Sequence, residues 1–383
     1  MSVALVNGRI LTDRGVVHGR AVVIADGRVE GIVAKTELPN GAERVDLEGQ
    51  LLLPGFIDMQ ANGGGGVLFG EAPTVEALRT MAEAHNRFGT TAFLPTLISG
   101  SPDVIKAAIA AVDEAIRLGV PGVAGIHIEG PFISLVRKGI HDTANFRRLD
   151  RDALALLISL KRGTTLVTLA PEMTSPEDVA ALRSAGVRVC AGHTNATYAE
   201  TRAALEAGLT GFTHLFNAMS PLTSRAPGVV GAALEDRDSW CGIIVDGKHV
   251  DPVVLRIALR CKRADKFVLV TDAMPSVGSM DKTFRLNGRL IHAQDGACFA
   301  EDGTLAGTDL DMASAIRNAM RLLDLDLHAA VQMASRNPAA FLGMDADMGR
   351  IEAGQRANLV LATDELSVIR CWINGSEVGG VNS

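Results

Sequence analysis

The feature that most constrains this chain is a pattern that repeats from Phe56 onward: a short apolar, β-branched run, a turn, and a helical stretch. Alternation of this kind is typical of strand–helix units that build a parallel sheet. Eight such units predict a closed (β/α)8 barrel of the TIM type, which uses roughly 250 residues. The expected strands are residues 55–60, 91–97, 123–129, 165–170, 187–192, 211–216, 242–246 and 267–271.

Helical stretches rich in Ala, Leu and Glu separate these runs. Several open on a Thr, Ser or Asp cap or carry Pro in the first turn, and several close on Gly just before the next strand. The expected helices are residues 74–88, 102–118, 150–161, 176–184, 198–207, 229–235, 252–261 and 309–323.

The two ends of the chain break the pattern. Residues 1–52 and 349–383 read as strand, turn and strand with no helix between. We predict that they pair into one small β-sandwich beside a barrel that spans residues 53–348. A β-rich stretch near 283–305 is expected to be an inserted hairpin, which the sequence does not place.

Composition excludes several classes of function. Hydrophobic residues make up 47% of the 383 residues, enough for a compact core. The net charge is −7 and Lys and Arg are scattered, so neither a nucleic-acid surface nor a membrane surface is expected. The five cysteines form no C-x-x-C pair, and no leader or spanning segment is visible. We therefore expect a cytoplasmic protein.

Polar residues stand where strands of the predicted barrel end. Glu129 ends the third strand, His193 follows the fifth, His214 lies in the sixth, and Asp272 follows the eighth. Active sites of such barrels lie at this rim. Two His and one carboxylate form a hydrolytic metal-site ligand set, and the other carboxylate is then free to act as general base.

A single histidine near a strand end is more often a hydrogen-bonded core residue than a ligand. Coincidence at several strand ends is what favours a metal site here. His127 is the counterexample, because it lies two residues before Glu129 and one layer deeper in the barrel. We interpret it as a structural histidine that supports the site.

A series of motifs along the chain resembles the N-acetylglucosamine-6-phosphate deacetylases of the amidohydrolase superfamily. The motifs, in order, are PGFIDMQANG, GIHIEGPF, KGIHD, AGHTNATY, THLFNAMSPLTSRAPG, GIIVDGKHV and LVTDAM. The resemblance covers essentially the whole chain. It implies a metal-dependent enzyme that hydrolyses N-acetyl-D-glucosamine 6-phosphate to D-glucosamine 6-phosphate and acetate in amino-sugar catabolism.

The resemblance also assigns residues. It places the metal ligands at Glu129, His193 and His214, the catalytic acid/base at Asp272, and a histidine that polarises the acetyl carbonyl at His141. For substrate contacts it indicates His249, and for the phosphate Asn217, Ala218 and Arg225. It further implies a homodimer in which Arg225 serves either its own subunit or the neighbouring one.

This chain departs from many amidohydrolases at the first strand. Where they carry a His-x-His pair for a second metal, it has Gln60 and Asn62, and it has Glu172 where a bridging lysine would follow the fourth strand. Amides are poor metal ligands, so one divalent ion per chain is expected. Zinc is the first choice, with iron(II) and cobalt as alternatives.

Other reactions stay open at this point. The same barrel could serve a cyclic-amide hydrolase or a deaminase, and a scaffold that has lost its chemistry is the alternative from another class. The phosphate contacts favour the deacetylase, since an uncharged substrate has no use for Arg225. The sequence does not exclude N-acetylgalactosamine 6-phosphate as a substrate.

Overall fold

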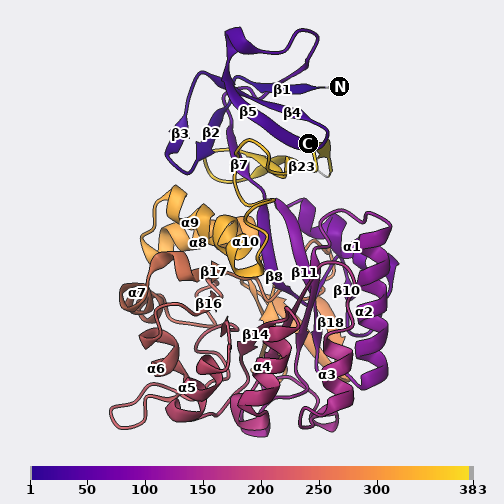
Figure 1. Cartoon of the computed structure of the whole chain (residues 1–383), viewed down its shortest axis with the longest axis vertical. Helices are drawn as coiled ribbons and strands as arrows, with labels where there is room; N and C mark the ends of the chain where they lie inside the picture. Colours follow the sequence, from indigo (N-terminus) through magenta and orange to yellow (C-terminus); the bar gives the residue numbers. More distant parts are fainter. Residues whose placement is uncertain (1, 379–383) are drawn as a thin grey trace.

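Eight parallel strands form the central sheet of the molecule, which the computed structural model describes over residues 2–378 (Figure 1). Neighbours pair in the order β17–β16–β15–β14–β13–β12–β11–β8, and every pairing is parallel. The strands are β8 (Phe56–Ala61), β11 (Thr90–Ile98), β12 (Gly125–Glu129), β13 (Thr164–Leu169), β14 (Arg188–Ala191), β15 (Gly211–Phe212), β16 (Trp240–Ile243) and β17 (Phe267–Leu269).

The first and last strands meet just beyond the end of β17. The backbone N–H of Asp272 donates to the Gln60 carbonyl at 2.9 Å, and that of Asn62 donates to the Ala273 carbonyl at 2.8 Å. An isolated parallel bridge joins Ala61 to Ala273. The sheet therefore closes into the predicted (β/α)8 barrel, and it closes at the rim where polar residues are expected.

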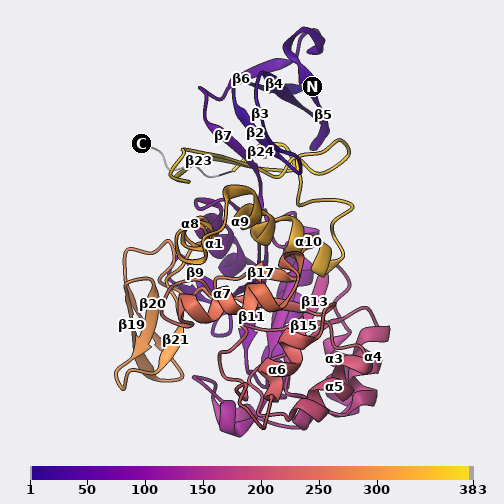
Figure 2. The ribbon, with the colours of Figure 1, turned by 90° about the vertical axis from the view of Figure 1, so that its left-hand side faces the viewer.

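Helices cover the outside of the barrel (Figures 1 and 2). They are α1 (Val75–Asn86), α2 (Pro102–Arg117), α3 (Arg151–Leu157), α4 (Pro176–Ser184), α5 (Tyr198–Glu206), α6 (Gly228–Glu235), α7 (Pro252–Cys261), α8 (Met312–Leu323), α9 (Leu327–Ala334) and α10 (Arg336–Leu342). The last two have no counterpart among the predicted helices. Within the described residues, no helix combines the length and apolarity needed to cross a membrane.

Strands from both ends of the chain share one sheet, in the order β24–β23–β22–β7–β2–β3. A second sheet has the order β5–β4–β1–β6. The strands are β1 (Val3–Val6), β2 (Arg9–Thr12), β3 (Gly15–Val17), β4 (Arg20–Ala25), β5 (Arg28–Ala34), β6 (Glu43–Asp46), β7 (Leu51–Pro54), β22 (Leu359–Ala362), β23 (Val368–Ile373) and β24 (Ser376–Glu377). Met1 and residues 379–383 of the predicted terminal segments lie outside the described residues.

The terminal sheets sit at the end of the barrel where strands begin, since β7 runs directly into β8 (Figure 1). Leu5, Ile10, Leu52, Leu359 and Trp372 are buried in a cluster of their own there. The rim at the other end of the strands is consequently free for a site.

The β-rich segment near 283–305 is larger than the inserted hairpin that was expected. The segment is a four-stranded antiparallel meander of β18 (Thr283–Leu286), β19 (Arg289–Gln294), β20 (Ala297–Ala300) and β21 (Leu305–Thr308). Its buried side chains pack on Met274 and Leu68, and Leu68 belongs to a short hairpin of β9 (Gly63–Gly64) and β10 (Val67–Leu68). The meander lies at the side of the barrel (Figure 2).

Candidate active site

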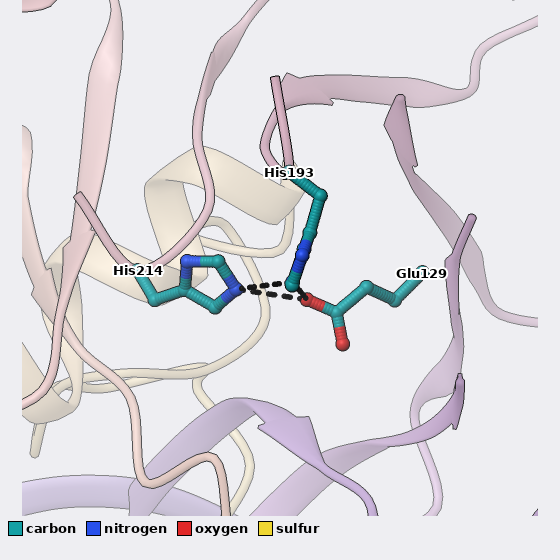
Figure 3. Close-up of side chains that lie close together, drawn as sticks. All are labelled: Glu129, His193 and His214. Atoms are coloured by element: carbon teal, nitrogen blue, oxygen red, sulfur yellow. Dashed lines mark hydrogen bonds and ion pairs between the residues drawn. The ribbon is translucent and has the colours of Figure 1, made fainter. Parts of the chain in front are cut away.

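Three side chains at the rim point toward one another (Figure 3). Glu129 ends β12, and His193 and His214 each lie two residues beyond a strand. The Nε2 atoms of His214 and His193 lie 3.0 and 3.4 Å from Glu129 Oε1 and 3.1 Å from each other. The side chains are buried, and their ligand atoms lie within 4.8 Å of one another.

The donor set of this cluster fits one divalent cation. His193 Nδ1 lies 2.9 Å from the Arg137 carbonyl and donates to it, which leaves the lone pair of Nε2 for the cluster. Burial raises the pKa of Glu129, but the two neighbouring histidines outweigh it and hold that pKa well below its usual range. Two imidazoles and an ionised carboxylate would hold a divalent cation such as zinc.

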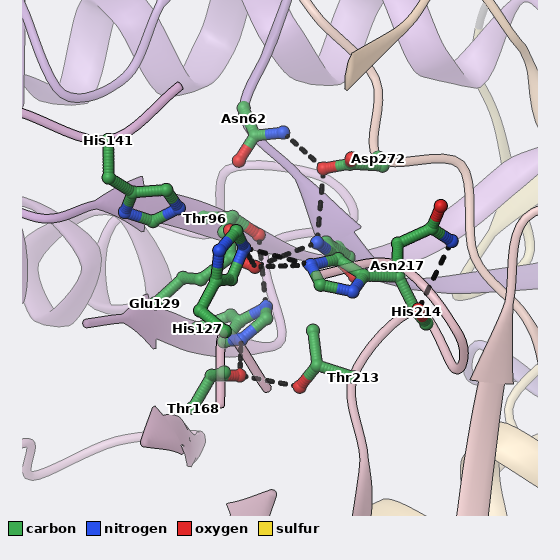
Figure 4. A network of polar contacts seen from close by, with 12 residues as sticks. Asn62, Thr96, His127, Glu129, His141, Thr168, Thr213, His214, Asn217 and Asp272 are labelled. Atoms are coloured by element: carbon green, nitrogen blue, oxygen red, sulfur yellow. Dashed lines mark hydrogen bonds and ion pairs between the residues drawn. The ribbon is translucent and has the colours of Figure 1, made fainter. Parts of the chain in front are cut away.

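Asp272 lies beside the cluster (Figure 4). Its Oδ1 accepts hydrogen bonds from Asn62 Nδ2 at 2.7 Å and from Gln60 Nε2 at 3.0 Å. The two amides at the place of the missing His-x-His pair therefore hold this carboxylate. Gln60 Nε2 also lies 3.3 Å from Glu129 Oε1, so it links the two acids.

Backbone conformation marks the same positions. His193, His214, Ala218 and Asp272 have φ angles of 47°, 33°, 50° and 55°, in the left-handed region that residues other than glycine seldom adopt. Such conformations persist where the surrounding structure requires them, and they gather at functional sites. Here they turn side chains inward just past the strand ends.

A cavity of about 350 Å³ opens above the cluster. All but one of the site residues predicted from the sequence line it: Glu129, His141, His193, His214, Asn217, Ala218, His249 and Asp272. Arg225 is the exception, because it is exposed on the loop between β15 and α6 and does not line this cavity. The rest of the wall comes from Met274, residues 304–307 of the meander, and Asn62, Ile98, Val136, Arg137, Gly139 and Ile140.

The profile of the Amidohydrolase family matches residues 51–378, and that of the NagA composite domain matches residues 3–52. The chain belongs to the amidohydrolase family. It is 42% identical over 371 residues to the N-acetylgalactosamine-6-phosphate deacetylase of Shewanella sp. (strain ANA-3), covering 96% of this chain and 93% of that protein. It is 36% identical over 378 residues to the N-acetylglucosamine-6-phosphate deacetylase of Haemophilus influenzae, covering 98% and 99%.

A solved structure agrees with these relatives. That of the N-acetylglucosamine-6-phosphate deacetylase from Pasteurella multocida matches with a TM-score of 0.94 at 35% identity, covering 98% of this chain and 99% of that one. The resemblance inferred from the motifs is confirmed, and this amidohydrolase is a hydrolytic enzyme.

Two further histidines of the amidohydrolase site are held by hydrogen bonds at Nδ1. His249 Nδ1 donates to Asp246 Oδ2 at 2.5 Å, and His141 Nδ1 lies 2.7 Å from Ser99 Oγ. Burial, and then the proximity of the His193 ring, hold the pKa of His141 well below its usual value. Both histidines line the cavity, so their other ring nitrogens are available to a ligand.

His127 and Glu172 stay outside the cluster. His127 lies beneath it with its ring nitrogens 3.4 Å from Thr96 Oγ1 and 2.7 Å from Thr168 Oγ1 (Figure 4). Burial lowers the pKa of His127 to about 4, so the ring is neutral. Glu172 accepts hydrogen bonds from the Thr194 hydroxyl and the Asn195 backbone N–H, both at 2.6 Å.

Sequence reasoning missed Ser99 and the hydrogen bonds from Gln60 and Asn62 to Asp272. Ser99 directly follows β11 and so stands at the rim like the other site residues. The rule of strand ends could have found it. The meander residues at the cavity wall carried no comparable signal, since their position depends on how the insert folds back.

Proposed function

We propose that this amidohydrolase removes the acetyl group of N-acetylglucosamine 6-phosphate, giving glucosamine 6-phosphate and acetate in amino-sugar catabolism. The observation that carries the proposal is the cluster of Glu129, His193 and His214 with Asp272 at one cavity. The named activity of the Haemophilus influenzae relative, which matches almost end to end, supports the choice of substrate.

In the proposed reaction, a bound cation and two side chains of this protein have separate roles. A divalent ion held by Glu129, His193 and His214, with zinc as first choice and iron(II) or cobalt as alternatives, supplies a Lewis acid that acidifies water and polarises a carbonyl. Asp272 takes the proton from the attacking water and returns it to the departing amine. His141 donates from Nε2 to the acetyl oxygen as negative charge develops there.

The sugar phosphate is proposed to bind at the opposite side of the cavity. Asn217 and Ala218 follow His214 and line the wall, and His249 contacts the substrate from the loop after β16. Arg225 supplies the positive charge that recognises the phosphate. As it does not line the cavity of its own subunit, we propose that it reaches the cavity of a second copy.

A homodimer would bring Arg225 to that place. Leu222 in the Arg225 loop is 55% exposed, and Val253 and Ile257, one turn apart on α7, are each 52% exposed. Large apolar side chains so exposed support burial against a second copy. We therefore propose a homodimer. We also propose that it is cytoplasmic, because the cysteines of the described residues are free thiols, as expected in a reducing compartment.

Acetate release tests the proposed function. N-acetylglucosamine 6-phosphate should yield acetate and glucosamine 6-phosphate, and unphosphorylated N-acetylglucosamine should react far more slowly. N-acetylgalactosamine 6-phosphate is the second candidate, because the Shewanella relative that is 42% identical bears that name. Faster turnover of the galactosamine isomer would reassign the substrate, and ammonia without acetate would indicate a deaminase.

We expect one divalent ion per chain at full activity. The amides of Gln60 and Asn62 are engaged by Asp272 and are poor metal ligands, so a second ion has no site beside the first. Elemental analysis of protein purified without added metal measures this. The ion should be missing from Glu129→Gln, and two equivalents in fully active wild type would contradict the prediction.

We expect activity to fall in acid. Burial, reinforced by the charge of Glu129, raises the pKa of Asp272 to about 6. A general base works unprotonated, so log(kcat/KM) should fall by about one unit per pH unit below that pKa. A cation at Glu129 would cancel part of the charge that raises the pKa of Asp272. The acid fall of the pH–rate profile is therefore expected at or below about pH 6.

The phosphate of the substrate also titrates at about pH 6. The pH dependence of kcat/KM is therefore measured on unphosphorylated N-acetylglucosamine as well. Metal content is followed at each pH to separate loss of the ion from protonation. A level profile on both substrates down to pH about 4.5 would count against Asp272 as the base.

A further inference from the structure

Ser99 contacts His141 but does not itself line the active-site cavity. Its Oγ is 2.7 Å from His141 Nδ1, and the two residues are 7% and 4% exposed. The Ser99 backbone N–H donates to the Glu129 carbonyl at 2.9 Å, and this hydrogen bond fixes the position of Ser99 relative to a proposed metal ligand. Gly130 makes room for the hydroxyl, because a Cβ atom on this residue would lie 2.3 Å from Ser99 Oγ. Its φ of 78° is also one that favours glycine.

Which of the two residues donates this hydrogen bond can be inferred from the number of acceptors near the Ser99 hydroxyl. Ser99 Oγ makes no other hydrogen bond within residues 2–378. If His141 Nδ1 donated, the buried hydroxyl hydrogen of Ser99 would have no acceptor among residues 2–378, which is costly. If Ser99 donates, its hydrogen is used and Nδ1 is the acceptor. A neutral ring whose Nδ1 accepts carries its hydrogen on Nε2.

We propose that Ser99 is a positioning residue that holds His141 in the tautomer with hydrogen on Nε2. The inference rests on the proposed role of His141, which needs a donor at the nitrogen that faces the substrate. The same hydrogen bond fixes the orientation of a ring packed 4.3 Å, between centroids, from that of His193. With Nδ1 protonated instead, Nε2 would present a lone pair to the acetyl oxygen and repel it.

Removing the hydroxyl tests the proposal in the zinc-loaded protein. Ser99→Ala should lower kcat roughly three- to tenfold with little change in KM, since a single buried hydrogen bond is lost and substrate binding is not. Ser99→Thr keeps the hydroxyl and should restore most of the rate. In a His141→Gln background, Ser99→Ala should have no further effect on kcat.

Nitrogen NMR of histidine-labelled protein reads the tautomer without any assay of activity. The signals of His141 are assigned as those that are absent from the spectrum of the His141→Gln variant. They should show a protonated Nε2 and an accepting Nδ1 in wild type and in Ser99→Thr, and a mixture in Ser99→Ala. Ser101→Ala is the matched control, because that hydroxyl caps α2 two residues away and should alter stability rather than kcat.

The outcomes separate this proposal from the function on which it rests. A protonated Nδ1 in wild type, or an unchanged tautomer in Ser99→Ala, would overturn the role of Ser99 whatever the enzyme hydrolyses. Equal loss of rate in Ser99→Ala and Ser99→Thr would overturn it too. Wild type with the expected tautomer but no acetate release would support Ser99 and refute the proposed function.

Discussion

Replacing Asp272 with asparagine is expected to lower kcat at least roughly a hundredfold while metal content and substrate affinity stay close to wild type. The substitution removes a proton acceptor and little else. Asparagine keeps an Oδ1 that can accept from Asn62 and Gln60 as the carboxylate does, so the cavity should retain its shape. Steady-state kinetics, elemental analysis and calorimetric titration with slowly hydrolysed substrate measure the three quantities.

Asp251→Asn provides the matched control. Asp251 caps the N-terminus of α7 beyond the strand ends, does not line the cavity, and asparagine is as good a cap. That variant should behave as wild type. Loss of the ion from Asp272→Asn would show that Asp272 is a ligand, and a kcat within a few-fold of wild type would move the proton transfer to another residue.

Two helices with a cap followed by Pro were predicted to the residue. The helices 176–184 and 252–261 match α4 and α7, each of which opens on a cap followed by Pro. The helix α10 was not predicted. Asn337-Pro338 is typical of a break, but Pro is tolerated in a first turn and Pro338 is the third residue of this helix.

The sixth strand shows where local pattern fails. An apolar run over 211–216 predicted a strand of six residues, but β15 has two, Gly211–Phe212. The reason lies in the site, since His214 and Phe216 adopt φ angles of 33° and 81° that no strand accommodates. Pattern alone favours extended backbone there. The left-handed turn brings His214 to Glu129 and His193, and no local signal encodes that contact.

Positions at strand ends predicted the cluster because parallel strands bring their ends together whatever lies between. That is why Glu129, His193 and His214 were found from the sequence. Contacts formed by loops were not found, among them Ser99 with His141. That pair joins residues 42 apart, and His141 lies in the irregular loop after β12, where no periodicity reports how the chain folds.

Replacing Arg225 with alanine is expected to lower kcat/KM on the phosphorylated substrate roughly ten- to a hundredfold. A charge-assisted hydrogen bond to phosphate contributes about 1.5–3 kcal/mol when desolvated. On unphosphorylated N-acetylglucosamine the variant should behave as wild type, whereas a misfolded or metal-poor protein would lose both activities in proportion. Equal losses on the two substrates, at unchanged metal content and melting temperature, would move phosphate recognition to another residue, with His249 next.

A mixed dimer decides which subunit the arginine serves. One subunit carries Arg225→Ala and the other Asp272→Asn, and differently tagged chains are co-expressed so that the mixed species can be isolated. If Arg225 reaches the neighbouring cavity, the Arg225→Ala subunit keeps Asp272 and receives an intact arginine from its partner. That site is then complete, and the mixed dimer should show about half of the wild-type kcat/KM on the phosphorylated substrate. If Arg225 serves its own subunit, the only site with Asp272 lacks its arginine, and activity falls to about half of that of the Arg225→Ala homodimer.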